Sequence, residues 1–163
     1  MPLQRHLSET LTLFKDSYFP SKRRYCHLLP YRSVIGVGGN VGDVRRRFVH
    51  LLRFLEEEKR IQVTQTSPIL KNPAFGYENQ ADFFNSVLVI QTSLRPKALL
   101  RYLLNVERRF GRQRSFANAP RTLDLDILFY DGYNHCDKTL CVPHPHWSER
   151  ESVLIPLSEM EKH

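Results

Sequence analysis

The sequence predicts an α+β fold, a ferredoxin-like split βαβ sandwich with a mainly antiparallel sheet, two main helices on one face and long loops. Apolar segments suited to strands occur at 33–39, 61–70, 83–92 and 123–129. Segments with helical 3.6-residue periodicity separate the first strand from the second and the third from the fourth. The resulting order, β-α-β-β-α-β, is typical of this fold.

Length and composition favour one domain and exclude several protein classes. The chain has 163 residues, of which 41% are hydrophobic and 25% charged, as in ordinary globular domains. No segment approaches the ~18 consecutive apolar residues of a membrane span, and the N-terminus lacks the apolar part of a secretory signal. We therefore expect no membrane partner.

The cysteines and the net charge bear on compartment and partners. Cys26, Cys136 and Cys141 form no C-x-x-C pair, which predicts reduced thiols in a cytoplasmic protein. The formal net charge of +7 attracts polyanions, but it does not distinguish nucleic acids from nucleotides.

Residues 1–32 are interpreted as an N-terminal arm or extension, and residues 33–163 as the main domain. Ser8 is a suitable N-cap for a short helix ending near Phe14. The stretch from Pro20 to Pro30 is basic and interrupted by proline.

The first strand runs from Ser33 into a glycine-rich turn, and Asp43 then caps a helix through Leu55. The arginine run 45–47 is electrostatically unfavourable at a helix N-terminus. The glycines at 36–42 resemble a dinucleotide fingerprint, but the third glycine is one place late and the βαβαβ context is missing. A tight turn at the edge of a pocket is favoured instead.

The middle of the chain supplies two more strands and a second helix. Residues 61–70 and 83–92 are predicted strands, joined by a loop at 71–80. Pro96 opens a helix whose buried face includes Leu99 and Leu103 and which ends at Gly111. The loop at 71–80 and the loop at 111–120 are both long enough to be active-site loops.

The last predicted strand, 123–129, carries two acidic side chains on one face. Alternation directs Leu123, Leu125, Ile127 and Phe129 to one side and Asp124, Asp126 and Leu128 to the other. The two carboxylates, roughly 7 Å apart, repel one another unless a cation offsets their charge. Mg²⁺ prefers such oxygen ligands together with phosphates and water. A solvated acidic edge is the alternative.

Basic and aromatic residues near this strand extend the candidate site. Five arginines surround the second loop, and they form either a solvated basic face or, with the aspartates, a polyphosphate site: Arg108, Arg109, Arg112, Arg114 and Arg121. Of Phe83 and Phe84, one is expected to face the core. The other, together with Asn85, is expected to line a pocket for a flat heterocycle.

The C-terminal segment contains a rigid histidine. His144 lies between two prolines, as would suit a phosphate donor, and a surface histidine is the alternative. Residues 147–150 are predicted to form a short helix and 153–157 an apolar stretch. Zinc is disfavoured because the spacing of His135, Cys136, Cys141, His144 and His146 matches no closed structural site.

These motifs together resemble the 6-hydroxymethyl-7,8-dihydropterin pyrophosphokinase family of folate biosynthesis. The run Pro120-Arg121-Thr122-Leu123-Asp124-Leu125-Asp126 is highly specific, and the resemblance extends over about 33–157. The supporting motifs occur in the same order and spacing: Gly38-Gly39-Asn40, 67–76, Asp82-Phe83-Phe84-Asn85, Glu107 with Gly111-Arg112, and Val142-Pro143-His144.

The resemblance implies an enzyme that transfers pyrophosphate from ATP to the hydroxymethyl group of the pterin and releases AMP. Residues 33–163 would be its pyrophosphokinase domain, acting as a monomer on ATP and pterin, without a nucleic-acid partner. Asp124 and Asp126 would hold two Mg²⁺ ions, and Arg112, Arg121 and Asp126 would be catalytic. The other implied contacts are Glu107, Arg112, Arg114, Arg121, Ile127, His144 and Arg150 for ATP, and Asn72, Pro73, Phe75, Phe83 and Asn85 for the pterin.

The sequence departs from the family pattern at the second side of the pterin. The family usually has an aromatic residue there, and Ser152 occupies the matching position here. Either stacking is one-sided or another ring, such as Trp147, takes its place. Two other functions use the same features: a ferredoxin-like nucleic-acid-binding module, for which no RRM-type motif is found, and another Mg²⁺-dependent phosphotransferase or nuclease.

Overall fold

The computed structural model describes residues 3–23, 28–74, 79–112 and 121–160. The strands are β1 (Leu3–His6), β2 (Thr12–Lys15), β3 (Ser21–Lys22), β4 (Tyr31–Gly39), β5 (Ile61–Thr66), β6 (Ile69–Asn72), β7 (Phe83–Thr92), β8 (Asp124–Tyr130), β9 (His135–Cys136) and β10 (Cys141–Val142). The helices are α1 (Val44–Glu56), α2 (Pro96–Arg109), α3 (Glu151–Met160) and a short 3₁₀ turn, η1 (Trp147–Glu149).

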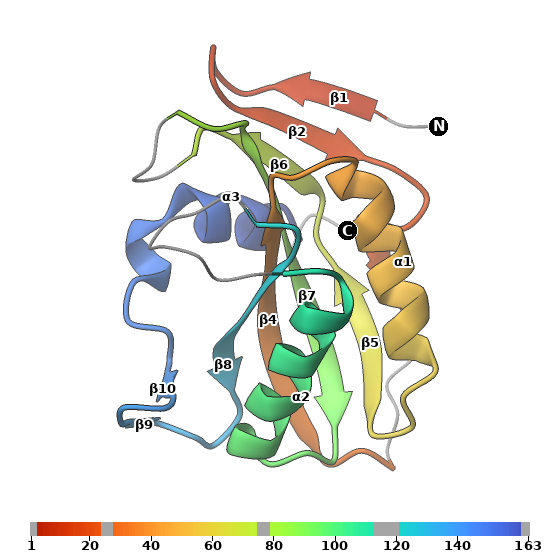
Figure 1. The fold of residues 1–163 in the computed structure, drawn as a ribbon, viewed down its shortest axis with the longest axis vertical. Coiled ribbons are helices and arrows are strands. Elements are labelled where there is room, and N and C mark those ends of the chain that lie inside the picture. The colour runs from red at the N-terminus through yellow and green to blue at the C-terminus, as the bar shows by residue number, and fades with distance from the viewer. Residues whose placement is uncertain (1–2, 24–27, 75–78, 113–120, 161–163) are drawn as a thin grey trace.

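The central sheet has the predicted split βαβ arrangement (Figure 1). β4 lies between β7 and β8, and β7 pairs at its N-terminal end with β6 and at its C-terminal end with β5. All of these pairs are antiparallel. The α+β prediction is therefore confirmed, although the predicted strand 61–70 is interrupted at Ser67–Pro68 and becomes β5 and β6.

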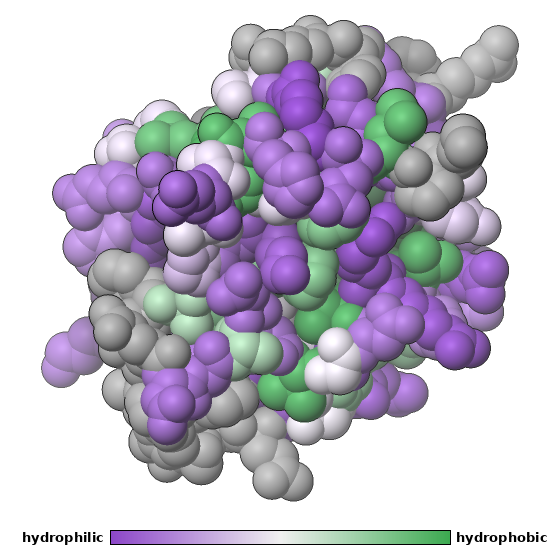
Figure 2. Space-filling view, turned by 90° about the horizontal axis from the view of Figure 1, so that it is seen from above, coloured by the Kyte–Doolittle hydropathy of each residue, from purple (hydrophilic) through white to green (hydrophobic). Residues whose placement is uncertain are grey.

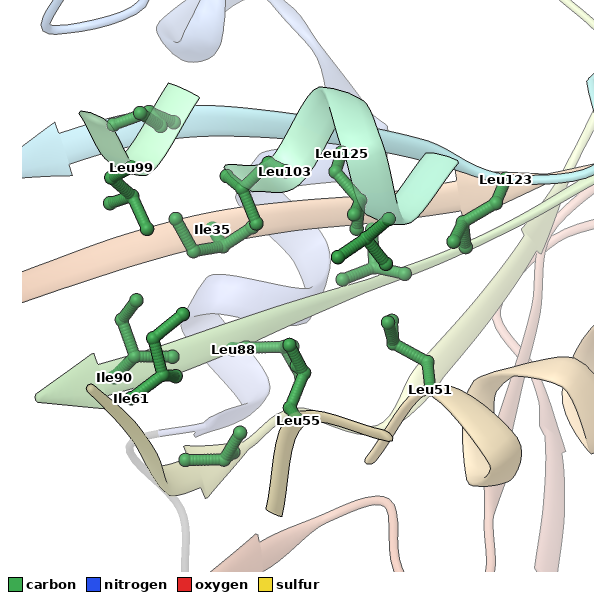
Figure 3. Close-up of a cluster of buried hydrophobic side chains, with 14 of the residues drawn as sticks. Ile35, Leu51, Leu55, Ile61, Leu88, Ile90, Leu99, Leu103, Leu123 and Leu125 are labelled. Carbon is green, nitrogen blue, oxygen red and sulfur yellow. The ribbon is translucent and has the colours of Figure 1, made fainter. Parts of the chain in front are cut away.

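The two predicted helices, α1 and α2, cover one face of the sheet (Figure 1). Figure 3 shows Leu51 and Leu55 of α1 and Leu99 and Leu103 of α2 directed toward Ile35 and other strand side chains. These residues belong to one buried hydrophobic cluster. Burial of such side chains contributes about 1.5–3 kcal/mol each, so this face of the sheet supplies most of the core.

The opposite face of the sheet is partly covered by α3, which packs against β6 and β7. Val153 and Met160 form a smaller buried cluster with Val87, Val89 and Leu128. The apolar stretch at 153–157 was predicted without a secondary structure, and it lies inside this helix. The remaining area of this face carries the cavity described below.

The predicted alternation of β8 holds at its start and fails at Phe129. Leu123, Leu125 and Ile127 lie in the large core cluster, as predicted. The β4–β8 register shifts between Val34 and Ile35, and such an irregularity places successive residues on the same face. Phe129 consequently packs with the α3-side cluster, beside Leu128, so its predicted position with Ile127 is wrong.

The N-terminal segment is incorporated into the sheet and contains no helix within residues 3–23. β1 and β2 form a hairpin, β2 pairs with β6, and β3 pairs with β5. Ser8 lies in the hairpin turn, where its hydroxyl accepts hydrogen bonds from the amides of Thr10 and Leu11. The predicted cap residue therefore stabilises a turn, because the same side-chain oxygen serves both structures.

The prediction of reduced thiols is wrong for two of the cysteines. β9 and β10 pair so that Cys136 lies opposite Cys141, and the two are joined by a disulfide. Cys26 lies outside the described residues. The sequence spacing gave no sign of this pairing because the hairpin, not a recognisable motif, brings the two residues together.

The surface at the β1–β2 end is largely hydrophilic, with its hydrophobic residues separated from one another (Figure 2). Among the helices of the described ranges, none combines the length and the hydropathy needed to span a bilayer.

Two glycines of β4 are predicted to respond differently to substitution. A Cβ at Gly39 would lie 2.8 Å from the carbonyl oxygen of Thr122, whereas one at Gly36 would lie 3.5 Å from the side chain of Leu128. Gly39→Ala should lower the free energy of unfolding in urea by about 1–3 kcal/mol. Gly36→Ala should change it by less than about 1 kcal/mol, and equal losses would contradict this explanation.

Candidate active site

A cavity of about 720 Å³ lies on the α3 side of the sheet. Strands β4, β7 and β8 form its floor, and the segment 149–153 at the start of α3 forms part of its wall. A second cavity, of about 700 Å³, lies between α1 and α2; Arg108 and Arg109 line it, but none of the residues that the family resemblance implies for ATP, pterin or metal does. The candidate site is therefore the first cavity.

Glycines in β4 make room for this cavity. Gly36 pairs with Asp126, and Gly38 pairs with Asp124 on one side and Asn85 on the other. Paired residues of neighbouring strands point to the same face, so both aspartates flank positions without side chains. A Cβ at Gly38 would lie only 2.6 Å from Oδ1 of Asn85. Glycine is therefore required here to make room for a cavity side chain, and no dinucleotide motif is needed to explain it.

Asp124 is held by two arginines. Arg112 Nη1 donates to Asp124 Oδ1 at 2.7 Å, and Arg121 Nη1 donates to Oδ2 at 3.1 Å. Arg112 also donates to Glu107 Oε2 at 2.7 Å, and the same oxygen accepts from the Leu125 amide at 2.7 Å. Glu107 is 2% exposed, so it anchors Arg112 and β8 from beneath the cavity floor.

Asp126 has the electrostatic environment of a cation ligand. Burial raises the pKa of its carboxyl to about 7, and the nearby charges of Asp124 and Glu107 act in the same direction. Arg150 and Arg121 oppose this shift without cancelling it. A bound cation would favour the ionised form, because opposite charge lowers a carboxyl pKa.

The donor set fits magnesium when phosphates supply the remaining ligands. Asp124 and Asp126 offer hard carboxylate oxygens, which Mg²⁺ takes in small number together with phosphates and water. Within the described part of the chain, no group of three or more histidine, cysteine or acidic side chains forms a metal site.

His144 and Arg150 also line the cavity. The amide of His144 donates to the Leu128 carbonyl at 2.9 Å, which fixes this segment to β8. Burial lowers the pKa of His144, and the positive charge of Arg150 and the nearby His146 lower it further. The imidazole is therefore mainly neutral near pH 7.

An aromatic ring and two side-chain amides, from β7 and β6, line the cavity on the side of β4 away from β8. Phe83 lines the cavity, and the Arg121 guanidinium lies 5.9 Å from its ring centroid. Phe84 packs on the opposite side of the sheet against the core, so the predicted division between the two phenylalanines is confirmed. Asn85 Nδ2 donates to Asn72 Oδ1 at 2.6 Å, which fixes both amides beside the ring.

The cavity brings together most of the predicted site residues. Ten of them line it: Asn72, Pro73, Phe83, Asn85, Arg112, Arg121, Asp124, Asp126, His144 and Arg150. The Glu107 side chain lies below the floor, and the Ile127 side chain lies in the core on the helical side. Phe75 and Arg114 lie outside the described residues.

The structure also bears on the position opposite Phe83. Ser152 lines the cavity, whereas Trp147 packs against Phe129 with a centroid separation of 4.9 Å and is not among the cavity-lining residues. Of the two alternatives, the geometry favours one-sided stacking.

Glu149 and Glu151 also line the cavity. Sequence reasoning missed them, because no local pattern indicated that this segment folds back over the sheet.

Asn40 and Arg47 hold the segment that leads into β8. Asn40 Oδ1 accepts from the Arg121 amide at 2.8 Å, and its Nδ2 donates to Gln80 and to the Ala81 carbonyl. Arg47 donates to the Thr122 carbonyl at 2.9 Å and to the Val41 carbonyl. The unfavourable position of this arginine in α1 is therefore offset by its hydrogen bonds to the segment that leads into β8.

Comparisons with known proteins agree on one family. Residues 34–162 match the sequence profile of 7,8-dihydro-6-hydroxymethylpterin-pyrophosphokinase. The chain is similar to proteins named 2-amino-4-hydroxy-6-hydroxymethyldihydropteridine pyrophosphokinase from Campylobacter jejuni (43% identity over 143 residues; 88% of this chain, 91% of that protein) and Helicobacter pylori (37% over 148 residues; 90% and 91%). The protein of that name from Bacillus subtilis is 39% identical over 126 residues (77% and 75%).

Two of these matches include part of the N-terminal segment. Residues 33–163 number 131, so a match over 143 residues takes in at least 12 residues of 1–32. The 148-residue match takes in more of that segment, and the 126-residue match is no longer than the main domain.

The raised pKa of Asp126 predicts a pH-dependent cost to stability. Between about pH 4, where an unfolded aspartate titrates, and pH 7, the native state holds a proton that the unfolded state has lost. The free energy of unfolding therefore falls as pH rises through this window. Asp126→Asn removes this dependence and, without ligands, should be more stable than the parent by roughly 1–3 kcal/mol above pH 7.

Asp137→Asn is the matched control for this measurement, made by denaturant unfolding at pH 5 to 8. Hydrogen bonds from Lys97 and from two backbone amides lower the pKa of Asp137, so its replacement should decrease stability at neutral pH. A loss of stability in both variants would contradict the assignment of Asp126.

Proposed function

Because this chain belongs to the 7,8-dihydro-6-hydroxymethylpterin-pyrophosphokinase family, we propose that it transfers pyrophosphate from ATP to the hydroxymethyl group of 6-hydroxymethyl-7,8-dihydropterin, releasing AMP in folate biosynthesis. One observation carries this proposal. A single cavity has two aspartates on its β8 side and a ring with two side-chain amides on its β6–β7 side, and three arginines also line it.

The charged end of the cavity suits the triphosphate of ATP. Arg112, Arg121 and Arg150 would contact phosphate oxygens, and His144 would donate one hydrogen bond from a neutral ring. Asp124 and Asp126 would hold the two Mg²⁺ ions, which, when bound, neutralise phosphate charge as it is redistributed. Glu107 would keep Arg112 in place through their 2.7 Å ion pair.

The opposite end of the cavity suits the pterin. The Phe83 ring offers an apolar face to a flat heterocycle. Asn85 and Asn72 offer amide donors and acceptors to its edge, with Pro73 beside them. Ser152 adds no second ring, so the proposal places the stacking on the Phe83 side only.

The reaction requires alignment more than it requires a base. The pterin hydroxyl oxygen forms a bond to the β-phosphorus of ATP, the bond from that phosphorus to the α–β bridging oxygen breaks, and AMP leaves. The hydroxyl proton is lost to solvent or to a phosphate oxygen. Catalysis of this kind rests mainly on positioning and electrostatic stabilisation, which the opposed ends of the cavity would provide.

We propose that the enzyme is cytoplasmic because its proposed substrates are ATP and a pterin. The cysteines do not support this compartment, because Cys136 and Cys141 form a disulfide. We also propose that the chain acts as a monomer, because all the residues assigned to the reaction lie in one protomer.

The proposed reaction is tested by product analysis. Purified protein with ATP, Mg²⁺ and 6-hydroxymethyl-7,8-dihydropterin should form AMP and the pterin diphosphate in equal amounts. Omission of the pterin should leave ATP intact. Formation of ADP, or of AMP without pterin, would contradict the proposal and favour another phosphotransferase or a hydrolase.

Asp126→Ala should retain the fold and lose kcat by roughly two to three orders of magnitude, the scale seen when one group stabilising transition-state charge is removed. Steady-state kinetics over a range of Mg²⁺ concentrations measures the loss. Unchanged turnover would exclude Asp126 from the reaction, and Asp137→Asn is the control with an acidic residue outside the cavity.

Phe83→Ala should weaken pterin binding by about 1–3 kcal/mol, the usual scale of stacking between a base and an aromatic ring, and leave ATP binding within about twofold. Phe83→Leu keeps apolar volume without a ring face, so it separates stacking from burial. Calorimetric titration with each ligand is the measurement. Equal weakening of both ligands would refute the stacking assignment.

A further inference from the structure

The N-terminal segment pairs with β6, the strand that carries Asn72. Residues 3–22, here called the strap, comprise the β1–β2 hairpin and the chain through β3. The hairpin lies at the edge of the sheet beside β6 (Figure 1). Without it β6 would be an edge strand, whose free main-chain groups are prone to fraying.

The register of the strap connects it to the cavity through two strands. Leu13 of β2 pairs with Leu70 of β6, and Leu70 pairs with Asn85 of β7. Two residue pairs beyond that, Asn72 lies opposite Phe83. The hydrogen bond between the side chains of Asn85 and Asn72 therefore depends on how β6 is held against β7, and β2 pairs with the free side of β6.

A side-chain contact reinforces this connection. The rings of Phe14 and Phe84 lie 5.9 Å apart, on the face of the sheet opposite the cavity. Phe84 lies between Phe83 and Asn85 in sequence, so its packing fixes the strand that carries both. The guanidinium of Arg45 in α1 lies 4.5 Å from the Phe14 ring centroid and 3.7 Å from Asp16.

The strap is anchored on both faces of the sheet. Phe19 is fully buried and packs against Phe48 of α1 at 5.8 Å. On the other face, Arg5 of β1 forms a 2.8 Å ion pair with Glu159 of α3. A segment held from two sides in this way can resist movement of β6.

We propose that the strap is a positioning element for the pterin end of the site, with Phe14 as its principal residue. It holds β6 and β7 so that Asn72 and Asn85 stay aligned beside Phe83. This inference rests on the proposed function. The inference adds that Phe14, a residue outside the cavity, affects the binding of the pterin and not that of ATP.

Phe14→Ala should raise the Kd of the pterin about tenfold while leaving the Kd of a non-hydrolysable ATP analogue within twofold. Both are measured by calorimetry with Mg²⁺, the pterin titration being made with the analogue bound. Phe14→Tyr keeps the ring and should restore pterin binding to within twofold of the parent. Equal increases in both dissociation constants would overturn the proposal, because a general loss of structure affects both ends.

Phe54→Ala is a closely matched control. Phe54 is also half-buried, its ring lies 5.9 Å from that of Phe110, and the Arg109 guanidinium lies 5.8 Å from it. It faces the second cavity, away from β6. This variant should leave the Kd of the pterin within twofold, and a tenfold increase would overturn the special role of Phe14.

Amide hydrogen exchange separates failure of this inference from failure of the proposed function. Phe14→Ala, without ligands, should speed exchange about tenfold at the β6–β7 end, as at Leu70 and Asn85, and leave α2 unchanged. Unchanged exchange at that end would overturn the inference even in an active enzyme. Faster exchange in a protein that releases no AMP when ATP, Mg²⁺ and the pterin are supplied would refute the proposed function and leave the strap's hold on β6 established.

Discussion

The structure depends on a balance of charge around β8. Asp124, Asp126 and Glu107 place three carboxyl groups near one another, and Arg112 bridges Asp124 and Glu107 with two 2.7 Å ion pairs. Arg121 adds a third ion pair, to Asp124. Asp126 remains the least compensated group, and burial raises its pKa to about 7. Such an arrangement costs stability in the free protein and suits a site that receives cations together with phosphates.

The rest of the fold supports this arrangement. Gly36 and Gly38 clear space above β4, while Leu123, Leu125 and Ile127 fix β8 to the core on the reverse side. Asn40 and Arg47 hold the chain just before β8. At the other end of the cavity, Phe84 and the strap hold the strand that carries Phe83 and Asn85. The two ends of the site are thus built on separate elements of one rigid sheet.

The sequence predicted the central fold because its signals are local, whereas several of the ten cavity residues, such as Asn72, Pro73 and Arg150, were implied by the family resemblance. Alternation in β8 separates aspartates from leucines, and helical periodicity marks α1 and α2. The position of Phe129 could not be predicted, because it depends on a register shift against β4. The short, mostly exposed strands of the strap carry no periodic pattern, and their pairing with β5 and β6 is long-range. The Cys136–Cys141 disulfide and the packing of 149–153 over the sheet are tertiary features for the same reason.

The most direct test of this account is a crystal structure with Mg²⁺ and a non-hydrolysable ATP analogue. The account predicts phosphates beside Arg112 and Arg121, with carboxylate oxygens of Asp124 and Asp126 bound to magnesium. A nucleotide bound elsewhere, with neither aspartate in contact with magnesium, would contradict it.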